Sequence, residues 1–137
     1  MSTPITVSVL VNAPLKKAWD YFSLPEHITQ WCQASADWHA PKASNDLREG
    51  GKFSTTMAAK DGSFSFDFGG TYTKVVPNEM FAYTMEDGRT CSVSFDETGD
   101  ETFITETFDP ETINPVEMQE AGWQAILNSF KTYIESH

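Results

Sequence analysis

The stretch from 114 to 134, NPVEMQEAGWQAILNSFKTYI, decides the fold. Its large apolar residues recur at three- and four-residue intervals, as on one face of a helix: Trp123, Ile126, Leu127, Phe130 and Ile134. Asn114 and Pro115 are typical of the N-cap and the first position of a helix, so we expect the helix to begin there. A long amphipathic helix gains most of its stability by packing its apolar face, and the rest of the chain must provide the surface.

Residues 34–109, before this helix, have the pattern of an antiparallel sheet. Polar and apolar residues alternate, most clearly between 64 and 68, where three phenylalanines alternate with polar residues. We expect strands at 47–49, 52–60, 63–76, 79–85, 89–96 and 101–108. Asp61-Gly62 and Asp87-Gly88 predict tight hairpin turns. Gly50-Gly51 predicts a turn in which at least one glycine has a positive φ, and Gly69-Gly70 predicts a bend or bulge.

The N-terminal part of the chain adds one strand and two short helices. Residues 5–11 alternate in the manner of a strand, and apolar residues between 15 and 22 then follow helical spacing. Pro25 begins a second short helix. The element order predicts an α+β fold in which a curved antiparallel sheet of six to seven strands wraps around the long C-terminal helix. With 137 residues, we expect a single domain spanning 1–137.

Composition excludes several classes of protein. Nine Lys and Arg against 20 Asp and Glu give a formal charge of −11, which disfavours nucleic acid and anionic lipid as partners. No apolar run reaches the length of a membrane span, and the N-terminus lacks the pattern of a signal peptide. Cys32 and Cys91, the two cysteines, do not make a disulfide framework, so we expect a cytoplasmic protein.

Catalytic motifs are absent from the sequence. It contains no phosphate-binding glycine loop and no nucleophile elbow. Cys32, Asp37 and His39 match no metal-ligand spacing, and we expect them to lie in a solvated loop. We therefore expect no catalytic residue, no metal and no cofactor.

Five short motifs, in order along the chain, resemble one known superfamily. They are Ala13-Pro14 with Ala18-Trp19, Pro25-Glu26-His27 with Trp31, LREGGKF at 47–53, Gly70-Thr71-Tyr72 through Val76-Pro77-Asn78-Glu79 to Tyr83-Thr84, and Gly122-Trp123 with Leu127. Together they resemble the START-like, or SRPBCC, superfamily, whose fold is the helix grip. Within it the chain is similar to the group related to the C-terminal domain of the heat-shock-protein ATPase activator. The superfamily hosts lipid binders, cyclases and co-chaperone domains, so the fold alone does not define a function.

The resemblance implies a cavity between the sheet and the last helix. The residues that would line it are Trp31, Phe53, Met57, Phe66, Phe68, Tyr72, Tyr83, Phe95, Ile104, Glu106, Trp123 and Leu127. Aromatic side chains also fill cores well, so a collapsed interior is the alternative. Glu106 would be unusual on the face toward the helix, where burial would raise its pKa; the alternative is a position near the sheet edge, in water.

Three functions are compatible with the resemblance. The first is a non-enzymatic domain that binds a small hydrophobic molecule, with its entrance near the second short helix, which could act as a lid. The second is a protein-interaction domain that regulates a chaperone ATPase, although the eukaryotic activator has a second domain that this chain lacks. The third is a cyclase-type enzyme with Glu106 and a tyrosine as acid and base, for which no clear pair of residues is present.

Overall fold

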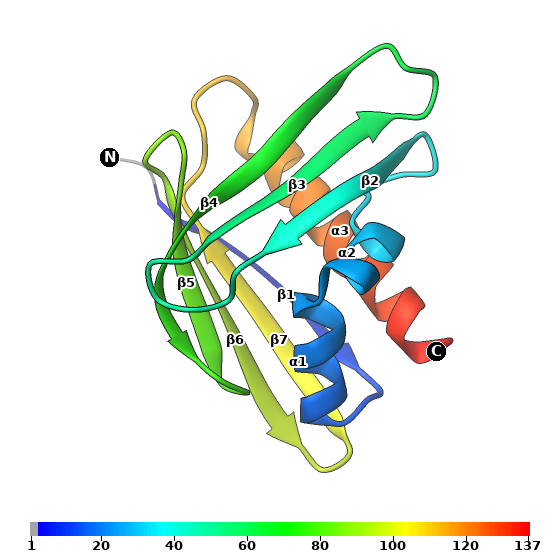
Figure 1. Ribbon diagram of the computed structural model, residues 1–137, viewed down its shortest axis with the longest axis vertical. Coiled ribbons are helices and arrows are strands. Elements are labelled where there is room, and N and C mark those ends of the chain that lie inside the picture. The colour runs from blue at the N-terminus through cyan, green and yellow to red at the C-terminus, as the bar shows by residue number, and fades with distance from the viewer. Residues whose placement is uncertain (1–2) are drawn as a thin grey trace.

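In the computed structural model, which describes residues 3–137, seven antiparallel strands form one sheet that curls around the C-terminal helix (Figure 1). The elements follow in the order β1 (Ile5–Val11), α1 (Leu15–Ser23), α2 (Pro25–Trp31), β2 (Trp38–Asn45), β3 (Lys52–Ala59), β4 (Ser65–Val76), β5 (Met80–Met85), β6 (Thr90–Thr98), β7 (Glu101–Phe108) and α3 (Val116–Glu135). This is the predicted α+β helix-grip fold, which is confirmed.

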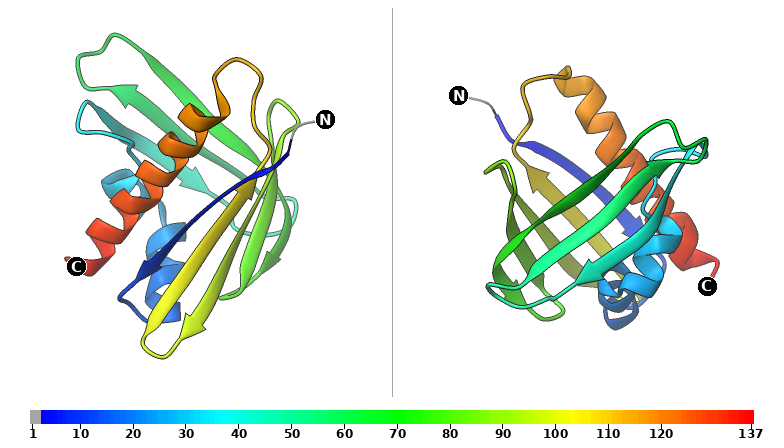
Figure 2. Two further views of the ribbon diagram at one scale, coloured as in Figure 1. Left: turned by 180° about the vertical axis from the view of Figure 1, so that it is seen from behind. Right: turned by 45° about the horizontal axis from the view of Figure 1, so that its top comes forward.

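The strand order β1-β7-β6-β5-β4-β3-β2 joins the first strand of the chain to the last. Val7 of β1 and Val93 of β6 both pair with Glu106 of β7, so β7 is an inner strand that lies next to the edge strand β1. Figure 2 shows α3 crossing the concave side of the sheet, where it packs along β1, while α2 packs on β2 at the other edge. None of the helices in residues 3–137 combines the length and the apolar character needed to cross a membrane.

The apolar stripe of α3 forms the centre of the core. Leu127, Phe130 and Ile134 are almost completely buried. The ring of Phe130 lies 5.0 Å, centroid to centroid, from the rings of both Phe22 in α1 and Trp31 in α2. The two short helices therefore close one end of the curled sheet by packing on the C-terminal half of α3.

The sequence did not predict β2, and the loop predicted around His39 is wrong. His39 lies in β2 and pairs with Ala58, whereas residues 47–49, predicted as a strand, belong to a turn. The pairing of β2 with β3 shifts register between His39 and Lys42, which places Pro41 in a bulge of an edge strand, where a missing backbone N–H is tolerated. In the turn, Gly50 has a φ of +82°, which confirms the predicted positive φ.

Two further local predictions need correction. The helix begins at Val116 with Pro115 as its N-cap, one residue later than predicted, because Asn114 does not cap it. The side-chain amide of Asn114 instead donates to the Glu111 carboxylate at 3.2 Å. The register shift in β4 lies between Tyr72 and Lys74, not at the preceding glycine pair.

Gly70 is required by close packing of backbone rather than by a bulge. A Cβ atom at this position would lie 2.4 Å from the carbonyl oxygen of Thr84 in β5, far inside van der Waals contact. We expect Gly70→Ala to lower the free energy of unfolding by about 1–3 kcal/mol, the usual cost of overpacking. Chemical denaturation midpoints measure this effect.

Gly122→Ala is the matched control for Gly70→Ala. Gly122 lies in α3, and no atom would lie within 4 Å of an added Cβ. Since alanine favours a helix over glycine by up to about 1 kcal/mol, this variant should be as stable as the wild type or more so. Equal denaturation midpoints for the two variants would contradict the conclusion that close backbone packing requires glycine at position 70.

Candidate functional site

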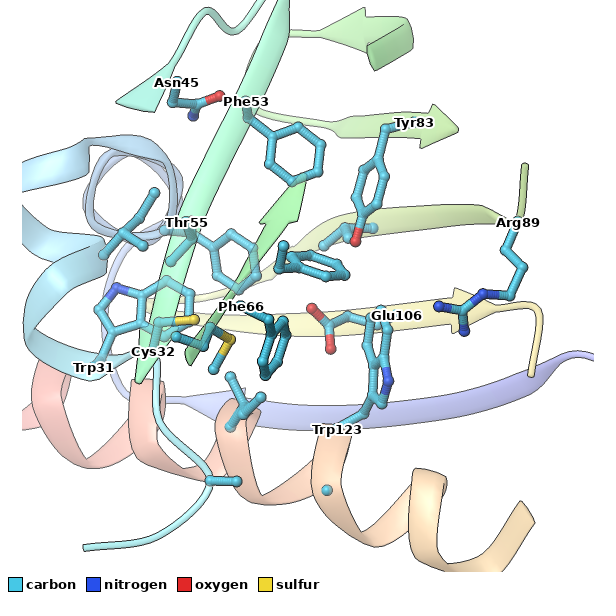
Figure 3. Close-up of a pocket in the computed structure, with 18 of the residues that line it drawn as sticks. Trp31, Cys32, Asn45, Phe53, Thr55, Phe66, Tyr83, Arg89, Glu106 and Trp123 are labelled. Atoms are coloured by element: carbon cyan, nitrogen blue, oxygen red, sulfur yellow. The ribbon is translucent and has the colours of Figure 1, made fainter. Parts of the chain in front are cut away.

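A cavity of about 460 Å³ lies between the concave face of the sheet and α3. This volume falls within the range of pockets that hold small organic ligands. Side chains from α2, α3 and the central strands contribute to its walls, and most of these side chains are aromatic or aliphatic (Figure 3). Helix α3 packs along β1, and the cavity lies between the helix and other strands of the curled sheet.

Most of the residues predicted to line a cavity do line this one: Trp31, Phe53, Met57, Phe66, Phe68, Tyr72, Tyr83, Glu106 and Trp123. Phe95, Ile104 and Leu127, also predicted, lie outside its walls in the surrounding core. Phe95 packs against Trp19 of α1 with ring centroids 5.1 Å apart, so its ring faces the closed end of the sheet.

Aromatic contacts join the sheet to the helix across the cavity. Trp123 of α3 stacks on Phe108 of β7 with ring centroids 3.8 Å apart, and Phe68 of β4 meets the Trp123 ring edge-on at 5.9 Å. Phe53 of β3 meets Tyr83 of β5 at 4.7 Å in the same edge-on geometry. These contacts fix the orientations of the rings, and the walls that the rings form are apolar.

The opening of the cavity lies between β4 and the N-terminal half of α3. Phe66 and Met118 both line the cavity and are also exposed, as is Ala34, which follows α2. Helix α2 itself is tied down, because the Trp31 indole N–H donates to the Tyr21 carbonyl at 2.9 Å and Ser129 donates to the Trp31 carbonyl at 2.7 Å. Ala34, three residues after α2, is the exposed lining residue nearest to α2 in the sequence, and α2 itself is a fixed wall rather than the predicted lid.

Glu106 is the central polar group of the cavity. Its residue is 9% exposed, and its carboxylate points into the cavity beside Trp123, with the hydroxyl of Tyr83 directed toward the same space (Figure 3). The alternative, a position near the sheet edge in water, is wrong because the side chain is buried, although β7 is the neighbour of the edge strand β1. No group of residues 3–137 donates a hydrogen bond to the carboxylate in the structure. Burial raises the pKa of Glu106 to about 8.

The other titratable groups near Glu106 are kept neutral by burial. Burial is the main cause that raises the pKa of Cys32 to about 12 and the pKa values of Tyr83 and Cys91 well above their ordinary values, and the Glu106 carboxyl adds to each. Arg89 lines the cavity beyond Trp123, but its guanidinium is paired with the Asp87 carboxylate at 2.7 Å.

Asn45 and Gln119 are two of the polar lining residues that the sequence analysis missed. Asn45 accepts a hydrogen bond from the Tyr72 hydroxyl at 2.6 Å and donates one to the Ser23 carbonyl at 2.7 Å, which fixes one end of the cavity. Gln119 is buried one helical turn before Trp123, and its amide bonds the backbone of Glu111 in both directions, at 2.8 and 3.0 Å. The four-residue spacing between Gln119 and Trp123 could have indicated that both face the cavity.

In the part of the chain from 3 to 137, no three His, Cys, Asp or Glu side chains lie close enough together to hold a metal ion.

Comparison with known proteins assigns the family. The sequence model of the family described as "Activator of Hsp90 ATPase homolog 1-like protein" matches residues 12–135. The chain belongs to this family. The match confirms the resemblance inferred from the sequence motifs, and it supports a binding-type domain in general terms.

Several solved structures are similar to this member of the family. Chr148 from Cytophaga hutchinsonii is 58% identical, with a TM-score of 0.84, over 97% of this chain and 92% of that one. The AHSA1-like protein from Aeromonas hydrophila is 40% identical, with a TM-score of 0.88, over 96% and 93%. The fold is also shared with the Aha1 dimer from Colwellia psychrerythraea, at 16% identity and a TM-score of 0.73 over 97% and 96%. A comparison with curated protein sequences finds no match.

Proposed function

We propose that this protein binds a small hydrophobic molecule in the cavity between the sheet and α3. The observation that carries the proposal is the cavity itself, about 460 Å³ in volume, with mostly apolar walls and one buried carboxyl group. Such a site gains affinity from the apolar area of the ligand, at about 25 cal/mol per Å² before the costs of ordering. The rings are held by contacts with one another, so little conformational entropy is lost when a ligand enters.

Titration with the neutral, environment-sensitive dye prodan tests the proposal. We expect saturable fluorescence enhancement with the folded protein. Met57 is buried in the cavity wall, so Met57→Trp should fill part of the space and weaken binding at least about tenfold, or 1.4 kcal/mol. Tyr83→Trp is a second filling variant at another wall of the cavity.

Ile113→Trp is the control for these filling variants. Ile113 is 86% exposed and lies outside the cavity walls, so an added indole there should leave dye binding unchanged. If no saturable site is found in the wild type, or if the filling variants bind as the wild type does, the proposal fails.

Regulation of a chaperone ATPase is the second candidate function. The family description names an Hsp90 ATPase activator, and Ile113, Val116 and Met118 expose apolar side chains at the start of α3, where a protein could dock. Native mass spectrometry of the protein purified from its own source separates the two functions. A co-purifying small molecule supports ligand binding, and a stoichiometric chaperone supports regulation.

We also propose that the protein works in the reducing cytoplasm. The proposal is supported by Cys32 and Cys91, which are both free thiols.

A further inference from the structure

The cavity contains a buried carboxyl group for which the chain supplies no partner. Glu106 is 9% exposed, its carboxylate points between Phe66 and Trp123 in Figure 3, and no hydrogen bond from residues 3–137 reaches it. Buried polar side chains in proteins are almost always hydrogen-bonded. A carboxyl group left unpaired at the centre of an apolar cavity is therefore a feature that a ligand can satisfy.

The titratable and charged groups around Glu106 favour a cationic ligand over an anionic one. The titratable groups that face it are the Tyr83 hydroxyl of β5 and the thiols of Cys91 in β6 and Cys32 after α2, all neutral. The charged groups that line the same cavity are already bound: the Arg89 guanidinium pairs with Asp87, and the Glu111 carboxylate accepts hydrogen bonds from Asn114.

Aromatic rings near the carboxylate also favour a positive charge. Phe66 and Trp123 flank Glu106 in the cavity, and the face of an aromatic ring attracts an ammonium group. The formal charge of −11 on the whole chain raises the local concentration of cations further, at low salt most of all.

We propose that the cavity selects an apolar ligand that carries a single protonated amine, and that Glu106 holds this amine. The inference rests on the proposed function and adds the chemical class of the ligand. The apolar body fills the space between the sheet and α3, and the ammonium donates a charge-assisted hydrogen bond to the carboxylate, which is stronger than a bond between neutral groups. An anionic ligand of the same shape would be repelled by Glu106.

Three probes with nearly the same body and different head groups test this proposal: phenylbutylamine, phenylbutanol and phenylbutyrate, with affinities measured by calorimetry. At about pH 9 Glu106, with its pKa of about 8, is largely ionised, while an alkyl amine, like lysine with a pKa of about 10.4, stays protonated. We expect the amine to bind about tenfold to hundredfold more tightly than the alcohol, and the carboxylate to bind most weakly.

The Glu106→Gln variant assigns the preference to this residue. We expect it to bind the amine and the alcohol with similar affinity, and to lose the pH dependence of the wild type, whose affinity for the amine should fall as the pH is lowered below about 8. Glu97→Gln removes the same charge from an exposed part of β6 and should keep both the preference and the pH dependence.

The outcomes separate this inference from the proposed function. Equal affinities for the amine and the alcohol in the wild type, or a preference that survives in Glu106→Gln, overturn the inference while the cavity remains a binding site. Failure of all three probes and of prodan to bind overturns the proposed function, and the inference with it. A preference for phenylbutyrate overturns the inference and assigns the polar end of the cavity to Arg89.

Discussion

Phe130→Ala is expected to lower the free energy of unfolding by about 3–5 kcal/mol, the range for a phenylalanine removed from a packed core. Phe130 has no exposed surface, and its ring contacts Phe22 and Trp31 at 5.0 Å each. Its ring joins α3 to both short helices, so its loss leaves a void that all three helices would have to close. Urea denaturation followed by far-ultraviolet circular dichroism measures the change.

Phe103→Ala is the matched control for Phe130→Ala. Phe103 lies on the outer face of β7 and is 40% exposed, so its truncation should cost about 1 kcal/mol or less. Trp123→Ala should lower the free energy of unfolding by an amount between those of the other two variants, because the Trp123 ring is stacked on Phe108 but also lines the cavity. If Phe130→Ala cost no more than Phe103→Ala, the apolar stripe of α3 would not be the centre of the core.

The fold could be predicted from the sequence because its strongest patterns are local. The spacing of Leu127, Phe130 and Ile134 and the hairpin turns ending in glycine each depend on neighbouring residues alone. The strand β2 could not be predicted in the same way. Its sequence, WHAPKASN, contains Pro41 and few residues that favour strands, and it is ordered by pairing with β3 and by packing under α2.

The cavity was harder to predict than the fold, since a sequence shows which side chains face inward but not how closely they meet. Phe95 and Phe53 both face the concave side of the sheet, yet only Phe53 lines the cavity. The difference arises because Trp19 of α1 packs on Phe95, whereas the aromatic neighbours of Phe53 all lie in the sheet. Glu106 stood out in the sequence as a carboxyl group on an apolar face, but its isolation depends on the two strands that flank β7.

The stability of the protein is expected to fall with rising pH because of Glu106. Burial raises the pKa of this carboxyl from 4.5 to about 8 in the folded protein. Below about pH 4.5 the carboxyl is protonated in both the folded and the unfolded state, so it has no effect on the pH dependence there. Between the two pKa values the unfolded chain releases the proton and the native protein keeps it, which lowers the free energy of unfolding by about 1.4 kcal/mol per pH unit. Above pH 8 the loss is complete, at about 4–5 kcal/mol.

Glu106→Gln isolates this effect, because an amide of nearly the same shape stays neutral at every pH. Other carboxyl groups act in the opposite direction: hydrogen bonds hold the pKa values of Asp61, Asp109 and Glu135 below their ordinary values, so the stability they provide is lost in acid. These groups are shared by the wild type and the variant and cancel in the difference between them. Urea midpoints should therefore be measured from pH 5 to pH 9. The midpoint of Glu106→Gln should rise relative to that of the wild type up to about pH 8. The urea midpoint of Glu97→Gln should depend on pH as that of the wild type does. If the midpoint of Glu106→Gln also has the pH dependence of the wild type, the Glu106 carboxyl is solvated rather than buried in the cavity.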